Sequence, residues 1–157
     1  MDSEKLHVKL GISGTYHDKV PHYQILLNDV VIQEGDITSP TDVVEYLEFD
    51  VEYATEEAVL GIRLTNKEDS DVLKDSYEDP NVYNIIGDML LNIVSVEIDE
   101  LDLGNLVYKN GLYTVDTPVD YNGETTSIIK NCMTMGWKGT WTLTWKNPFY
   151  IWMLENI

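Results

Sequence analysis

The stretch GWKGTWTLTW, residues 136–145, decides the fold class of this chain. Its tryptophans, Trp137, Trp141 and Trp145, recur every fourth residue, a spacing that suits one face of a helix or one face of a strand. The intervening residues resolve the choice, because three β-branched threonines alternate with the apolar side chains. Gly139 would also cost a helix about 1 kcal/mol. The segment is therefore predicted to be a strand with an indole face and a threonine face.

Three roles are open for the indole face. Core packing is the default, because large aromatic side chains are usually buried. A flat ring can also stack on the C–H face of a pyranose and so form a sugar platform. Tryptophan is in addition one of the residues enriched at protein interfaces.

Alternating apolar residues predict further strands, at 6–12, 45–53 and 58–66. A hairpin is predicted over 23–35, because Asn28-Asp29 between its two arms tolerates left-handed backbone conformations. Short strands with regular turn signals and almost no helical pattern indicate an all-β protein. We expect a single β-sandwich domain spanning residues 1–157.

The stretch MLLNIVSVEI, residues 89–98, is predicted to be a central strand, with Leu91 and Ile93 on one face and Val96 and Ile98 on the other. LVYKNGLYTV, residues 106–115, resembles a hairpin that turns at its Asn-Gly pair. Residues 67–88 and 116–127 are polar and are predicted to be loops.

The charge balance excludes several functions. Ten Lys and Arg against 28 Asp and Glu give a formal net charge of −18, which makes nucleic acid an unexpected partner. No apolar run is long enough to span a bilayer, so no membrane association is expected, and the first residues carry no secretory-signal pattern. The single cysteine, Cys132, excludes an intramolecular disulfide.

The loop KEDSDVLKDSYEDP, residues 67–80, concentrates carboxylates. It is either a solvated acidic loop or a calcium site, since calcium prefers six to eight oxygen ligands. A cation would relieve the repulsion among these side chains and order the loop. The candidate metal ligands are Asp69, Asp71, Asp75 and Asp88.

The last nine residues, FYIWMLENI, are apolar on both faces when they are read as a strand. Such a strand must be covered twice, either centrally in a sheet or by docking on a neighbouring subunit. The candidate contacts with a partner or a glycan are Trp145, Phe149, Tyr150 and Trp152.

Two resemblances extend these inferences. The order Leu64-Thr65-Asn66, acidic loop, then DMLLNIVSVEID (88–99) resembles calcium-dependent xylan-binding modules, which are jelly-roll β-sandwiches. Those modules carry a calcium-binding Asp after the Asn, where this chain has Lys67, while Asp88 matches a later acidic position.

The blocks at 88–106 and 131–157 resemble sandwich domains in structural proteins of marine tailed phages. That resemblance implies a virion location, and a virion structural or decoration protein that assembles with other virion proteins or with itself. The alternative is a calcium-assisted carbohydrate-binding module that recognises a host surface polysaccharide. No catalytic constellation can be assembled from the residues, so we expect that the protein is not an enzyme.

Overall fold

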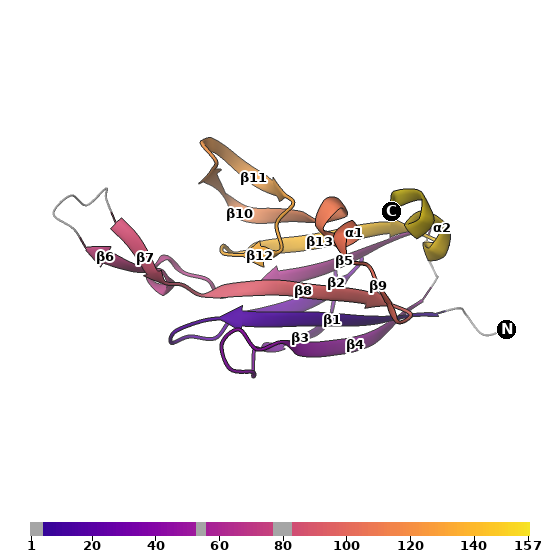
Figure 1. Cartoon of the computed structure of the whole chain (residues 1–157), viewed down its shortest axis with the longest axis horizontal. Helices are drawn as coiled ribbons and strands as arrows, with labels where there is room; N and C mark the ends of the chain where they lie inside the picture. Colours follow the sequence, from indigo (N-terminus) through magenta and orange to yellow (C-terminus); the bar gives the residue numbers. More distant parts are fainter. Residues whose placement is uncertain (1–4, 53–55, 77–82) are drawn as a thin grey trace.

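The computed structural model describes residues 5–52, 56–76 and 83–157. It is a β-sandwich: two antiparallel sheets pack their inner faces against one hydrophobic core (Figure 1). This architecture confirms the all-β sandwich predicted from the sequence.

The first sheet has the strand order β12-β8-β1-β4, with β9 paired to β8. Its strands are β1 (Lys5–Thr15), β4 (Glu45–Glu52), β8 (Leu90–Ile98), β9 (Leu101–Asp102) and β12 (Thr134–Met135). Strand β8 lies between β12 and β1, as the prediction of a central strand at 89–98 required.

The second sheet has the strand order β11-β10-β13-β5-β2-β3. Its strands are β2 (His22–Leu27), β3 (Val30–Asp36), β5 (Glu57–Leu64), β10 (Leu112–Tyr121), β11 (Glu124–Lys130) and β13 (Gly139–Lys146). The hairpin β2–β3 turns at Asn28 and Asp29, both with positive φ, as predicted.

The remaining elements are short. They are a 3₁₀ turn η1 (Asp69–Asp71), a strand pair β6 (Leu73–Ser76) and β7 (Tyr83–Gly87), and the helices α1 (Asn105–Asn110) and α2 (Phe149–Asn156). The pair β6–β7 projects from the end of the molecule opposite α2 (Figure 1). The described residues include no helix with the length and apolar character of a membrane span.

Strand β13 contains most of the stretch that decided the fold class. It pairs with β10 and β5 inside the second sheet, and its residues Trp141, Leu143 and Trp145 are fully buried. The prediction of a strand with an apolar indole face is thus confirmed for Trp141 and Trp145. The prediction is wrong for Trp137, which precedes the strand and is partly exposed.

A β-bulge changes the predicted faces of β8. Gly11 pairs with Ser95 and the next residue, Ile12, pairs with Ile93, so Val94 is an extra residue on β8. After the extra residue, the side chains that point into the core are those that period-two alternation would place outside. Ile93 before the bulge and Val96 after it are therefore both buried, and Val94 is exposed. Strict period-two reasoning had placed these two buried residues on opposite faces.

The prediction of a hairpin turning at Asn110-Gly111 is wrong. Residues 105–110 form helix α1, and β10 begins at Leu112. A Cβ atom on Gly111 would lie 2.5 Å from the indole of Trp141, so packing against that ring explains the glycine. The predicted loop 116–127 is also wrong, since Asn122 and Gly123, both with positive φ, connect β10 to β11 in a hairpin.

The prediction of a C-terminal strand is wrong as well. Residues 149–156 form helix α2, which begins directly after Pro148. Phe149 is buried, and Trp152 and Met153 pack against the core, a helical i, i+3, i+4 spacing. The predicted loop 67–88 likewise contains regular structure, namely η1, β6 and β7.

Candidate functional site

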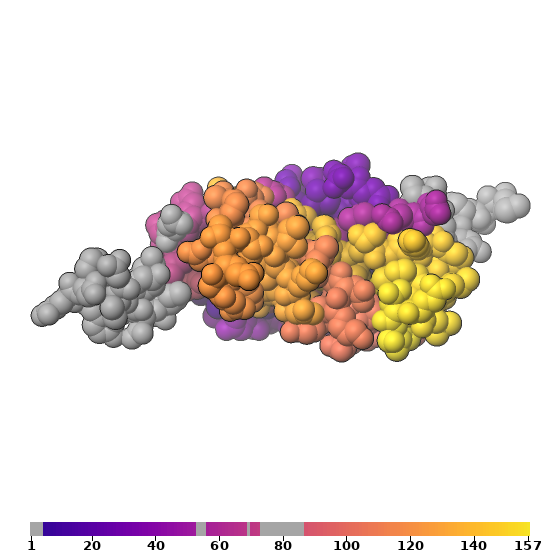
Figure 2. Space-filling view, turned by 90° about the horizontal axis from the view of Figure 1, so that it is seen from above, coloured from indigo at the N-terminus to yellow at the C-terminus, as the bar shows by residue number. Residues whose placement is uncertain are grey.

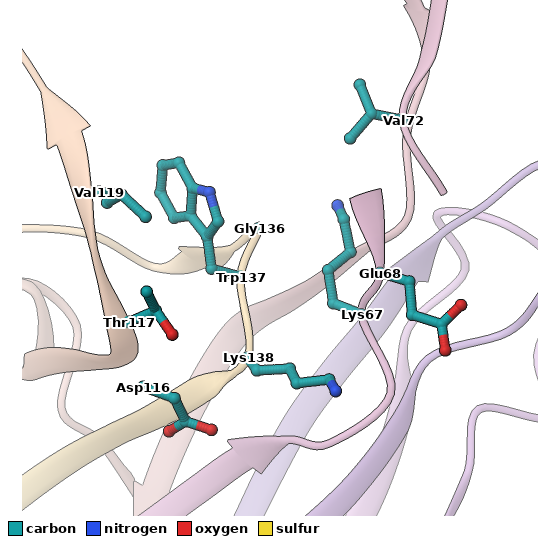
Figure 3. A pocket seen from close by; sticks show the side chains of 9 residues that line it. All are labelled: Lys67, Glu68, Val72, Asp116, Thr117, Val119, Gly136, Trp137 and Lys138. Atoms are coloured by element: carbon teal, nitrogen blue, oxygen red, sulfur yellow. The ribbon is translucent and has the colours of Figure 1, made fainter. Parts of the chain in front are cut away.

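A groove of about 540 Å³ opens at the end of the second sheet near β6 (Figure 3). Three segments that are distant in the sequence line it. They contribute Lys67, Glu68 and Val72; Asp116, Thr117 and Val119; and Gly136, Trp137 and Lys138. Its volume lies within the range of about 300–1,000 Å³ that is typical of small-molecule sites.

The groove exists because β10 leaves β13 part-way along its length. The two strands pair only over Leu112–Val115 and Gly139–Thr142, and the Asp116 amide makes one more bond, to the carbonyl oxygen of Lys138 at 2.9 Å. Pro118 then lacks the N–H that a ladder needs, and the pairing of β10 with β11 shifts register between Thr114 and Val119.

Trp137 is held in place through its backbone. The Trp137 amide donates to the hydroxyl oxygen of Tyr113 at 2.8 Å, and that hydroxyl donates to the Trp137 carbonyl oxygen. Tyr113 is itself fully buried, and burial raises the pKa of its hydroxyl, which therefore stays protonated as a donor. Trp137 is 38% exposed, and its ring stands with Val119 on one side of the groove, facing Lys67 and Val72 (Figure 3).

Some of the polar groups near the groove floor already form hydrogen bonds within the protein. Arg63 donates to both carboxylate oxygens of Asp116, at 3.0 and 2.6 Å. These bonds lower the pKa of Asp116, which stays ionised at neutral pH. Lys138 is exposed beside Asp116, and its side chain extends toward the Lys67 side of the groove (Figure 3).

The opposite wall contains a buried lysine. Lys67 is 7% exposed, and its Nζ donates to Asp88 Oδ1 and, at 2.7 Å, to the carbonyl oxygen of Met89. Asp71 is bound in a similar way by Lys19, with Nζ 2.8 Å from Oδ2. Burial alone would raise the pKa of Asp71, but the hydrogen bonds from Lys19 and from the Glu68 amide lower it.

The described residues contain no group of side chains that could hold calcium. Of the four predicted ligands, Asp71 and Asp88 are each paired with a lysine ammonium, and the side chains of Asp69 and Asp75 lie outside the described part. Within the described ranges no three His, Cys, Asp or Glu residues are grouped so that they could hold a metal ion. The described residues therefore supply no calcium ligand set, and the roles of Asp69 and Asp75 stay predictions.

The predicted aromatic contact residues separate into two groups. Trp145 and Phe149 are fully buried and pack edge to face with ring centroids 5.9 Å apart, so neither ring is accessible to a glycan or a partner. Tyr150 is partly exposed and its hydroxyl donates to Asp99, while Trp152 packs on Phe149 at 6.0 Å. Contact through Tyr150 and Trp152 stays a prediction.

The sequence pattern marks Trp137 only as a member of the indole face, and no pattern in the sequence singles out Tyr113, Asp116 or Lys138. One signal marks Trp137 as different. It lies between Gly136 and Gly139, and a Gly-rich bend interrupts the strand there. Nothing local in the sequence brings Lys67 to face it.

Two solved structures resemble the chain. One is vCBM60 in complex with galactobiose, with a TM-score of 0.53 and 7% sequence identity, covering 87% of this chain and 96% of that chain. The other is a selenomethionine form of vCBM60, described as linking two families of calcium-dependent carbohydrate binding modules by circular permutation. It has a TM-score of 0.52 and 8% identity, and covers 88% and 89% of the two chains. The likeness is one of fold.

No family model and no curated protein matches the sequence.

Proposed function

We propose that this protein is a carbohydrate-binding domain without catalytic activity, and that its sugar site is the groove beside Trp137. The observation that carries the proposal is the partly exposed indole of Trp137, which faces a concave site with polar groups at its floor. The fold supports the proposal, since the resembling structures are carbohydrate-binding modules and one was solved with galactobiose.

The groove has the chemistry that a sugar requires. The indole offers a flat apolar surface to the C–H face of a pyranose, and its backbone is fixed by two hydrogen bonds to Tyr113 before any ligand arrives. Thr117, Asp116 and Lys138 supply a hydroxyl, a carboxylate and an ammonium that can bond to sugar hydroxyls. A rigid stacking surface with a few polar groups is the usual composition of a small-molecule site.

Charge favours an uncharged glycan as the ligand. The formal charges of the groove lining cancel, since the two lysines Lys67 and Lys138 are matched by the two acids Glu68 and Asp116. Lys67 and Asp116 are in addition paired with Asp88 and Arg63. The chain as a whole carries a formal charge of −18, which repels polyanionic polysaccharides until salt screens it. Galactans and xylans are therefore better candidates than alginate or pectate.

Affinity gel electrophoresis tests this function. The protein is run through native gels that contain galactan, xylan or alginate, with an acidic protein of similar size as the mobility control. We expect retardation by at least one uncharged polysaccharide and none by alginate at low salt. Unchanged mobility in every uncharged polysaccharide, together with no heat of binding to their oligosaccharides in calorimetry, would contradict the proposal.

A second candidate function is assembly, and helix α2 favours it. Ile151 and Leu154 lie on the helix at i and i+3 and are 55% and 70% exposed, and Ile157, the C-cap residue that follows the helix, is 78% exposed. An apolar stripe of this kind supports contact with another copy or with other virion proteins. Light scattering of the wild type and of Leu154→Ser tests it: we expect a multimer that the substitution dissociates, and a monomeric wild type would count against self-assembly. The virion location stays a prediction.

A further inference from the structure

Lys67 is unusual because an ammonium group is rarely buried. The residue is 7% exposed in a chain with only ten Lys and Arg. Lysines are almost never fully buried unless they are paired, since removing the charge from water is costly. Its surroundings should therefore explain what the charge does there.

The Lys67 ammonium joins the two ends of the segment that leaves the sandwich after β5. It lies three residues beyond Leu64, the last residue of β5, and bonds to Asp88 and Met89, immediately before β8. Asp88 Oδ1 also accepts from the Met89 amide at 2.8 Å, so the carboxylate fixes the backbone at the start of β8 as well. The ammonium of Lys67 thus links the chain just after β5 to the chain just before β8.

The neighbouring carboxylate is held in the same manner. Lys19 contributes a bond of 2.8 Å to Asp71 Oδ2, and the positive charge of Lys67 also favours the ionised form of Asp71. A carboxylate and a carbonyl oxygen around a positive centre are the ligand types that calcium takes in proteins. Here they surround a covalently attached ammonium.

We propose that the ammonium of Lys67 is a built-in cation that takes the place of a divalent ion at the base of residues 67–88. The groove wall formed by Lys67, Glu68 and Val72 is then fixed without calcium, in contrast to the calcium dependence named for the resembling modules. The stability that Lys67 gives to this wall does not depend on whether the groove binds sugar.

Thermal unfolding of the wild-type protein is the first test. Melting is recorded in calcium chloride and in EDTA at equal ionic strength, because salt alone screens the acidic surface. We expect the two melting temperatures to agree within about 1 °C, since a site that does not bind an ion gains nothing from it by mass action. A calcium-specific rise of several degrees would overturn the proposal.

Two variants test the role of the ammonium itself. Lys67→Gln removes the charge and leaves Asp88 unpaired, and we expect the melting temperature to fall by at least about 5 °C with or without calcium. Lys146→Gln is the matched control, because Lys146 is exposed on β13 and the same charge is lost. Equal melting temperatures of the two variants would overturn the proposal.

Lys67→Asp replaces the ammonium by a carboxylate on a shorter side chain, so the space beside Asp88 that the ammonium occupied is left open to an ion. We expect this variant to melt low in EDTA and to regain several degrees in calcium, because a divalent ion can then occupy the vacated position. Melting that calcium leaves unchanged would overturn the claim that the ammonium stands in for such an ion. None of these measurements uses a sugar, so their outcome is independent of the proposed binding function.

Discussion

Replacing Trp137 by alanine should weaken sugar binding by a calculable amount. Trp137 exposes 38% of its surface, which is roughly 95 Å² if a fully exposed tryptophan presents roughly 250 Å². At about 25 cal/mol per Å², a sugar that covers between half and all of this area gains about 1–2.5 kcal/mol from it. We therefore expect Trp137→Ala to raise Kd by about 5- to 60-fold.

Calorimetry with the best oligosaccharide found in the gel assay measures this change, and thermal unfolding verifies that each variant is folded. Trp137→Phe keeps a flat ring and should lose much less affinity than the alanine variant. Trp152→Ala is the matched control, because Trp152 lies on α2, away from the β10–β11 side of the molecule (Figure 2). It should leave Kd within twofold of the wild type.

Two results would refute the reasoning. If Trp137→Ala binds as tightly as the wild type, the indole is not the stacking surface. If Trp152→Ala loses as much affinity as Trp137→Ala, the sugar contacts the C-terminal helix, as the sequence had suggested, or the loss reflects general instability. The melting curves separate these two explanations.

Three further predictions concern the framework around the groove. Tyr113→Phe removes the hydroxyl that bonds to both backbone groups of the groove tryptophan, and should reduce affinity several-fold and stability by about 1–3 kcal/mol, measured by calorimetry and urea unfolding. Gly111→Ala should lower the free energy of unfolding by about 1–3 kcal/mol, because its Cβ would lie 2.5 Å from the Trp141 indole. Gly136→Ala is the control: its Cβ would make only an ordinary contact at 3.4 Å, and its free energy of unfolding should be nearly that of the wild type. His22 Nδ1 donates a hydrogen bond to the carboxylate of Asp36 on β3, and this bond raises the pKa of His22 above its ordinary value of 6.5. The stabilisation is therefore present below pH 6.5 and is lost as pH rises through the folded pKa, so the free energy of unfolding in urea should fall between pH 6 and pH 8, and should fall less in His22→Gln.

The strands were predictable where alternation and turn chemistry agree. The hairpin at Asn28-Asp29 and the strand containing Trp141 and Trp145 satisfy both, and both are present. A period-two pattern gives no sign of an inserted residue. The bulge at Val94 therefore made the predicted faces of β8 wrong beyond that point.

The local sequence alone does not show which of two Asn-Gly pairs forms a hairpin turn. Asn110-Gly111 and Asn122-Gly123 are alike locally, yet only the second makes a hairpin. The difference is tertiary, since Gly111 is packed against the ring of Trp141 and the preceding residues form a helix. The C-terminal run posed a similar problem, because a segment apolar at nearly every position fits either period.

The groove was the part least accessible to sequence reasoning. Trp137 and Lys67 are 70 positions apart, and only the splaying of β10 away from β13 leaves a space between them. The substitution of lysine for an expected acidic residue at position 67 was visible in the sequence. Its structural meaning required the position of the ammonium beside Asp88 and Met89.

Because β10 diverges from β13, this part of the domain contains positions that can be substituted with little loss of stability. Thr117 and Val119 lie beyond the last paired residues of the two strands, outside the cluster of fully buried side chains. Randomising Thr117, which is exposed, should alter which glycans are retained while the melting temperature stays nearly constant, whereas polar residues at Val119, which packs against the core, should also lower it. Such a hairpin is a natural starting point for engineering reagents of new selectivity on an unchanged framework.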